Sequence, residues 1–243
     1  MSRSFKIFHR SLQSTLTSKY LYVIPIGGIA VTIFLAMNAY VYPGDTGLPP
    51  AESSIRYSII MANLLGCFMA AFIGSNTPLS KGYELELTKP VSRWQYILCQ
   101  MLGEIILPLL TAAAILLGTH TYLLYKGEPF HTEIILIIGL LSISIVALFG
   151  FVKVFSFIVD QFLALACSIL VVFLSTQGFR GALLKMGYIR PILYIIPDLQ
   201  TSTLISLNLL LGMDVEWKYF LAVFLYAVFS ILAVSYLFQK KDL

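Results

Sequence analysis

The fold is decided by residues 95–125, which read QYILCQMLGEIILPLLTAAAILLGTHTYLLY. An α-helix needs about 20 residues to cross the hydrocarbon of a bilayer, because each residue adds about 1.5 Å. This run is longer than that, and Glu104 is the one acidic residue in it. We therefore expect a membrane-spanning helix that is tilted or extends past the bilayer.

The composition of the whole chain points to a membrane location. Of its 243 residues, 58% are hydrophobic and 12% are charged, whereas a soluble domain carries about 25% charged residues. So few charges cannot cover a water-facing surface, which excludes a soluble globular protein. Basic residues do not interleave with exposed aromatic residues, so we do not expect nucleic acid as a partner. The first residues predict no cleaved signal peptide.

Further apolar runs predict an all-α, polytopic membrane protein with six transmembrane helices. Residues 1–19 place apolar side chains at helical spacing with cations among them, which favours an N-terminal interfacial helix over a plain basic tail. Residues 178–217 mix prolines and cations with short apolar runs, which predicts short re-entrant or interfacial helices in an extracytoplasmic segment. The expected spans are residues 20–41, 57–73, 95–125, 133–153, 162–175 and 218–238.

The loops follow from the breaks between these runs. The polar stretch that ends at Ser54 predicts a loop before the second span. A turn is expected around residues 154–161, with Lys153 and Asp160 at its two ends, where a charge costs little.

The cations predict the orientation. Lys and Arg concentrate in the cytoplasmic loops of membrane proteins. If both termini are cytoplasmic, ten of the 16 Lys and Arg residues lie inside and six outside, so we expect that orientation. The ten are Arg3, Lys6, Arg10, Lys19, Lys81, Lys89, Arg93, Lys153, Lys240 and Lys241.

Known catalytic motifs are missing from the sequence. It has no phosphate-binding loop of the form GxxxxGK[ST] and no HExxH or GxSxG motif. The three cysteines stand in apolar runs without a metal-binding spacing, and His9, His120 and His131 are scattered. We therefore expect no catalytic residue, cofactor or metal site in this chain.

Asn63 and Glu104 fall inside expected spans and are the candidates for a polar pathway through the membrane. Glu104 could line a pathway or carry a proton, because a charge in hydrocarbon is costly unless it is paired or hydrated. Alternatively, it could lie near the headgroups or accept a hydrogen bond from a neighbouring helix at Asn63.

A polar segment over residues 75–90 separates the second and third spans. Pro78 suits the first turn of a new helix, and Pro90 ends what precedes it. Acidic and leucine residues alternate between the two prolines. The pattern predicts a short amphipathic helix on the cytoplasmic side, which could dock into a soluble partner; the alternative is an ordinary loop held by headgroups.

Residues 82–94, GYELELTKPVSRW, resemble the cytoplasmic segment of ABC-2 type permeases. The C-terminal run YLFQKKDL at residues 236–243 and the run IPDL at residues 196–199 are also similar to that family. Six spans and an N-terminal surface helix resemble the subgroup related to multicopper-enzyme maturation permeases.

The resemblance implies a membrane subunit that works as a dimer in the cell (inner) membrane and is driven by a separate cytosolic ABC ATPase. That ATPase would bind ATP and magnesium, and the export of an unidentified substrate would follow. The segment 75–90 would be the coupling helix. A membrane scaffold or assembly factor that moves no solute is the alternative. The residues implied in ATPase coupling are Ser80, Lys81, Tyr83, Glu84, Glu86, Leu87, Lys89, Pro90 and Arg93.

Overall fold

A computed structural model of the chain is entirely helical in the parts that it describes. No strand occurs in those parts, as the sequence predicted for an all-α protein. The coupling segment expected at 75–90 lies almost wholly outside them, as does most of the segment expected at 178–217. The structure describes residues 3–17, 22–41, 48–76, 92–129, 131–175, 185, 198–215 and 217–240.

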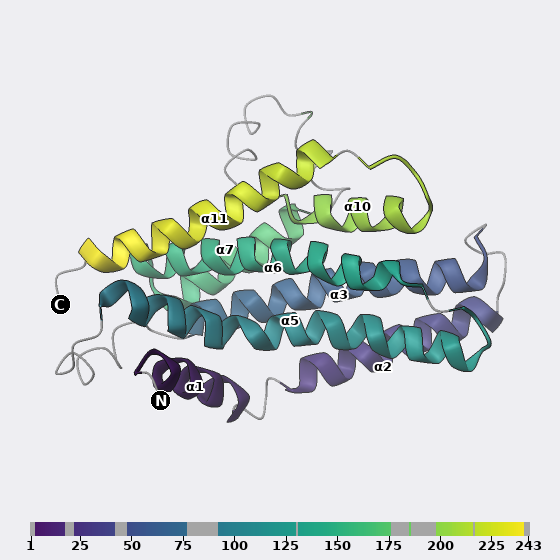
Figure 1. Cartoon of the computed structure of the whole chain (residues 1–243), viewed down its shortest axis with the longest axis horizontal. Coiled ribbons are helices and arrows are strands. Elements are labelled where there is room, and N and C mark those ends of the chain that lie inside the picture. Colours follow the sequence, from purple (N-terminus) through teal and green to yellow (C-terminus); the bar gives the residue numbers. More distant parts are fainter. Residues whose placement is uncertain are drawn as a thin grey trace.

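Within the described residues, five helices are long and apolar enough to cross a membrane, each with 19 to 33 residues. They run alongside one another (Figure 1), and several apolar helices of this length identify a membrane protein. They are α2 (Val23–Val41), α3 (Pro50–Asn76), α5 (Arg93–Tyr125), α6 (Glu133–Ile158) and α11 (Trp217–Lys240).

The span expected at 162–175 corresponds to a shorter helix, α7, which runs from Gln161 to Leu174 and has 14 residues. It is separated from α6 by a two-residue turn, and Asp160 accepts a hydrogen bond there from the backbone N–H of Phe162. A second short helix, α10 (Leu199–Leu210), has 12 residues. Neither is long enough to cross a bilayer alone.

Helix α3 begins earlier than the sequence predicted. The residues before Ser54 were expected to form a loop, but the helix starts at Pro50. Proline suits the first position of a helix. A backbone N–H at that position would have no intrahelical acceptor, and proline has no N–H to leave unpaired. The backbone N–H of Ser53 then bonds to the carbonyl of Pro49, which closes the first turn.

Helix α1 (Arg3–Thr17) lies beside the start of α5 at one end of the bundle, the end at which α11 also ends (Figure 1). It buries Ile7 and Thr15 and leaves Phe5 exposed. We call this end the inner end and the opposite end, at the α5–α6 turn, the outer end. Tyr40 near the end of α2 donates a hydrogen bond to Glu128 of that turn at 3.0 Å.

Helix α5 packs against α1, α2, α3, α6 and α11. The core around it is made of large aliphatic and aromatic side chains. Where α6 meets α11, Gly150 faces Ser230 so closely that a Cβ atom at Gly150 would overlap the serine hydroxyl. The largest fully buried core residues include Ile97, Ile115, Leu116, Leu141, Ile145 and Phe149.

Candidate functional site

A buried ion pair joins α5 to α6 near the inner end of the bundle. The Lys153 Nζ atom lies 2.6 Å from Glu104 Oε2, and the two side chains are 0% and 1% exposed. The prediction that Lys153 stands at an exposed turn was wrong, because α6 continues without a break to Ile158. Glu104 does not contact Asn63 as one alternative proposed; its partners are Lys153 and a neighbour on its own helix.

That neighbour is Gln100, whose Nε2 donates to Glu104 Oε1 at 2.8 Å. Both carboxylate oxygens of Glu104 are therefore contacted. The Lys153 ammonium also lies 5.5 Å from the centre of the Phe149 ring, within the range of a cation–π contact.

The energetics of such a pair are asymmetric. Forming it gives little net stabilisation, because both charges lose their hydration, whereas removing one partner costs about 3–5 kcal/mol by leaving a buried charge uncompensated. The pair therefore makes the relative positions of α5 and α6 hard to change unless both charges stay together or become hydrated.

Helix α1 is attached to the same turn of α5. Ser11 Oγ donates to the backbone carbonyl of Gln100 at 2.9 Å. Gly103 faces α1 so closely that a Cβ atom at this position would come within 2.9 Å of Phe8 O and Leu12 N. Only glycine fits so close to another backbone. Helices α1, α5 and α6 thus meet at residues 100–104, which we call the inner junction.

The start of α5 is held at the inner end. Ser92 caps it by accepting a hydrogen bond from the Gln95 N–H at 3.3 Å. Arg93 Nη1 donates to the carbonyl of Gln239, near the end of α11, at 3.0 Å. Arg93 is the one expected coupling residue that the structure describes. The others, which lie outside the described residues, are Ser80, Lys81, Tyr83, Glu84, Glu86, Leu87, Lys89 and Pro90.

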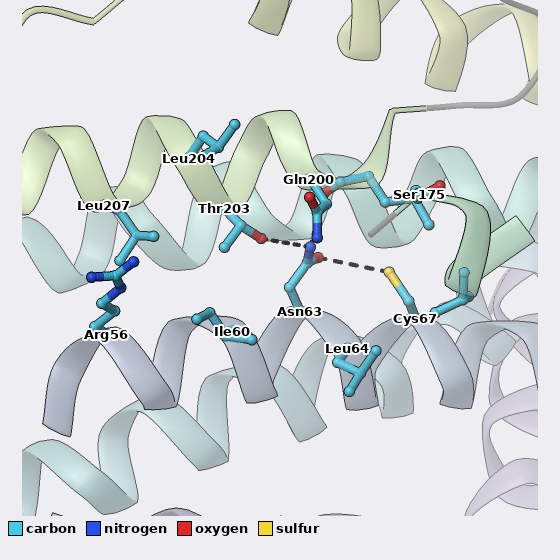
Figure 2. Close-up of a pocket in the computed structure, with 12 residues that line it drawn as sticks. Arg56, Ile60, Asn63, Leu64, Cys67, Ser175, Gln200, Thr203, Leu204 and Leu207 are labelled. Atoms are coloured by element: carbon cyan, nitrogen blue, oxygen red, sulfur yellow. Dashed lines mark hydrogen bonds between the residues drawn. The ribbon is translucent and has the colours of Figure 1, made fainter. Parts of the chain in front are cut away.

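A cavity of about 220 Å³ lies between α3, α10 and the end of α7 (Figure 2). Leucine and isoleucine side chains make up much of its wall, with polar groups placed among them. We call it the α3–α10 cavity. Its lining residues are Arg56, Ile60, Asn63, Leu64, Cys67, Val172, Ser175, Leu199, Gln200, Thr203, Leu204 and Leu207.

Asn63 joins the two helices that form this cavity. Its Nδ2 donates to the Leu199 carbonyl and to Thr203 Oγ1, both at 2.8 Å, and Cys67 Sγ lies 3.7 Å from its Oδ1 (Figure 2). On the neighbouring helix α6, Ser144 Oγ donates to Ser202 Oγ at 2.6 Å. The polar residue that the sequence singled out therefore ties α10 to the bundle.

Two polar groups of the cavity are not satisfied in this way. Gln200 Oε1 is buried, and no described residue donates a hydrogen bond to it; an unmet buried acceptor costs about 1–3 kcal/mol. Arg56 is exposed, and no described carboxylate lies within ion-pair distance of it. The sequence did not single out either residue. The signal for Arg56 is a helical spacing that places it with Ile60 and Asn63 on one face of α3, whereas Gln200 lies on α10.

Two of the three histidines come closer together than the sequence suggested. The rings of His120 and His131 lie 6.0 Å apart in an edge-to-face arrangement. Within the described part of the chain, no three His, Cys, Asp or Glu side chains gather in a group that could hold a metal ion.

No protein-family model matches the sequence, and no curated protein matches it either.

Proposed function

We propose that this chain is the membrane-spanning permease subunit of an ABC-2 type transporter, not an enzyme in itself. A separate cytosolic ATPase would bind ATP and magnesium and drive it. The observation that carries the proposal is the course of α5. This helix begins at Arg93, where the run that resembles the family's cytoplasmic segment ends, and about three turns later it contacts both α1 and Lys153 of α6.

This arrangement supports a mechanical route from the cytosol into the bundle. Closure of the ATPase on ATP would push on residues 75–90, and α5 would carry that displacement to the inner junction as a rigid helix. Because the ion pair ties α5 to α6 and Gly103 fixes α1 against α5, the three helices would move as one unit. Two such chains would then rock against each other and expose a pathway between them. The direction of transport would be set by the difference in substrate affinity between the two conformations of the dimer.

The positions of the chain ends support six crossings. Helix α6 ends at the inner end, where Phe157 packs against Phe238, and α11 runs back to that end from Trp217. We infer that the chain crosses once more between Ile158 and Trp217. We assign this crossing to α7 and α10 together, which measure about 21 Å and 18 Å and meet beside the α3–α10 cavity. Half-helices are tolerated in membranes where protein buries their ends.

The cations support a cytoplasmic inner end. Lys153 is buried in its ion pair and no longer counts as a loop cation. Arg180, Lys185 and Arg190 stand between the two halves of the sixth crossing. Nine cations remain for the inner side against three for the outer side. The bias keeps its sign, so we place both termini in the cytoplasm and the protein in the cell (inner) membrane.

The experiment is purification of the tagged chain from its native membranes in mild detergent, with mass spectrometry of the proteins that accompany it. We expect an ABC ATPase in about equal amount and a second permease chain. The double change Glu84→Arg/Glu86→Arg should remove the ATPase while leaving the second permease chain bound.

The matched control is Glu133→Arg, which reverses an exposed charge at the start of α6 on the outer side. It should leave the ATPase bound. If no ATPase accompanies the wild-type chain from membranes that contain one, the scaffold hypothesis replaces the transporter. If the ATPase stays bound after the double change, residues 75–90 are not the coupling segment.

A further inference from the structure

The α3–α10 cavity has a cation at one end. Arg56 lies about two turns into α3 from its outer end, and Leu207 lies opposite it near the end of α10 (Figure 2). Helix α3 reaches the outer end of the bundle at Pro50, so Arg56 lies at the depth at which lipid headgroups begin. A guanidinium there suits a carboxylate or phosphate, which it can bind through two hydrogen bonds.

The middle of the cavity is apolar and open on one side. Ile60 and Leu204 line it from opposite helices, and they are 41% and 38% exposed. The surface of a membrane-spanning bundle faces lipid, so a hydrocarbon chain can enter between these residues without leaving the bilayer. The volume of about 220 Å³ is below the roughly 300–1,000 Å³ of pockets that enclose drug-sized molecules, which favours a slender ligand.

The end of the cavity that lies nearer the inner end of the bundle contains a hydrogen-bond acceptor. Gln200 lies across from Asn63 and Cys67 (Figure 2), and no described residue donates to its buried Oε1 atom. Along α3, Asn63 stands seven residues from Arg56, about 10 Å away. A hydroxyl on the ligand at that distance from its anionic group would satisfy the amide.

We propose that the α3–α10 cavity binds a linear, lipid-derived amphiphile with an anionic head at Arg56, an apolar chain between Ile60 and Leu204, and a hydroxyl at Gln200. The ligand enters sideways from the outer leaflet. That this ligand is the transported substrate rests on the proposed function, whereas its binding does not.

The test measures binding to the chain alone, without any ATPase, in nanodiscs of neutral phosphatidylcholine. A lauric acid that carries a diazirine photolabels the chain, and the labelled peptides are identified by mass spectrometry. We expect saturable labelling of the peptides around Cys67 and Leu204. Competition should be strongest with lauric acid that carries a hydroxyl on its eighth carbon, which matches the spacing from the carboxylate, weaker with lauric acid and weakest with dodecanol. Labelling of the exposed side of α11, which includes Phe224 and Phe229, should not saturate and measures the background.

The variants separate the three contacts. Arg56→Gln should weaken binding by roughly tenfold or more, as expected for the loss of a charge-assisted hydrogen bond, and Arg56→Lys should keep most of it. Gln200→Leu should abolish the advantage of the hydroxylated acid over lauric acid. Ile60→Trp fills the cavity without a change in charge and should abolish saturable labelling. Lys126→Gln, which removes another cation near the outer end, should have no effect.

Three results would overturn the proposal. The first is labelling that does not saturate, and the second is that dodecanol competes as well as lauric acid does. The third is that Lys126→Gln weakens labelling as much as Arg56→Gln. These outcomes are distinct from a failure of the proposed function. Binding without an ATPase partner leaves an amphiphile site in a protein that does not transport, whereas an ATPase partner without binding leaves a permease whose substrate binds elsewhere.

Discussion

Glu104 and Lys153 are buried charges in the interior of a membrane protein, and each makes the other tolerable. A lone charge at that depth costs several kcal/mol and would draw in water or change its protonation state. Lys153 neutralises the carboxylate of Glu104, and Gln100 donates a hydrogen bond to the other carboxylate oxygen, so the two charges are compensated inside the bundle. The role of the ion pair follows from the position of Glu104, which comes directly after Gly103, where α1 packs against α5.

A double-mutant cycle tests this pairing. Glu104→Leu and Lys153→Met should each destabilise the chain by about 3–5 kcal/mol, because each leaves one buried charge alone. The double variant Glu104→Leu/Lys153→Met should recover most of that loss. Thermal unfolding in detergent measures all three variants. Additive losses in the double variant would mean that the two charges do not stabilise each other.

Sequence reasoning at this scale identified Glu104 but assigned Lys153 to a turn. The residues after Lys153, VFSFI, contain no glycine, proline or asparagine, so nothing in this run favours an end of the helix before Val159. A continued helical reading would have placed Lys153 inside α6. Its partner could not have been predicted, because pairing across helices depends on how α5 and α6 are rotated against each other.

At the scale of elements, α1 depends on a glycine beneath it. Gly103→Ala should destabilise the chain by about 1–3 kcal/mol, since the added methyl would meet the α1 backbone and force it outward. Amide exchange within residues 3–17 should quicken, because α1 would leave its place on α5.

The matched control is Gly139→Ala on α6, where a Cβ atom meets nothing within 4 Å. The substitution should be neutral or stabilise the chain by up to about 1 kcal/mol, because alanine favours a helix more than glycine does. Equal effects of the two substitutions on exchange in α1 would show that Gly103 does not hold that helix.

The contacts of α10 give a second prediction at this scale. Asn63→Leu should destabilise the chain by about 1–3 kcal/mol, because the Thr203 hydroxyl and the Leu199 carbonyl lose their shared donor. Leu64→Met, at the next position of α3 and also in the cavity wall, should cost less than about 1.5 kcal/mol. Comparable losses in thermal stability would assign Asn63 to packing alone.

The long helices were predictable because a run of apolar residues is sufficient to identify each one. The short helices α7 and α10, to which we assign the remaining crossing, were not predictable in this way, since each is shorter than a span and packs against α3 and α6. The early start of α3 was missed for a related reason: Glu52 and Ser53 look like loop residues until the proline before them is recognised as a helix start.

At the scale of the whole molecule, the two ends of the bundle should face opposite compartments. In a chain whose native cysteines have been replaced, Lys126→Cys should react with a membrane-impermeant maleimide in spheroplasts. Lys240→Cys should react only after permeabilisation. Both residues are exposed, one at the α5–α6 turn and one at the end of α11. The reverse pattern would invert the orientation and place residues 75–90 beyond the reach of a cytosolic ATPase.

We propose that a cytosolic ATPase drives this bundle through residues 75–90 and α5. The measurement that decides this is the rate of ATP hydrolysis by the purified ATPase, measured alone, with the wild-type chain in nanodiscs, and with the chain carrying Glu84→Arg/Glu86→Arg. We predict that the wild-type chain changes the rate several-fold and that the charge-reversed chain leaves it at the value of the ATPase alone. An equal rate in all three samples would show that the chain does not couple to the ATPase.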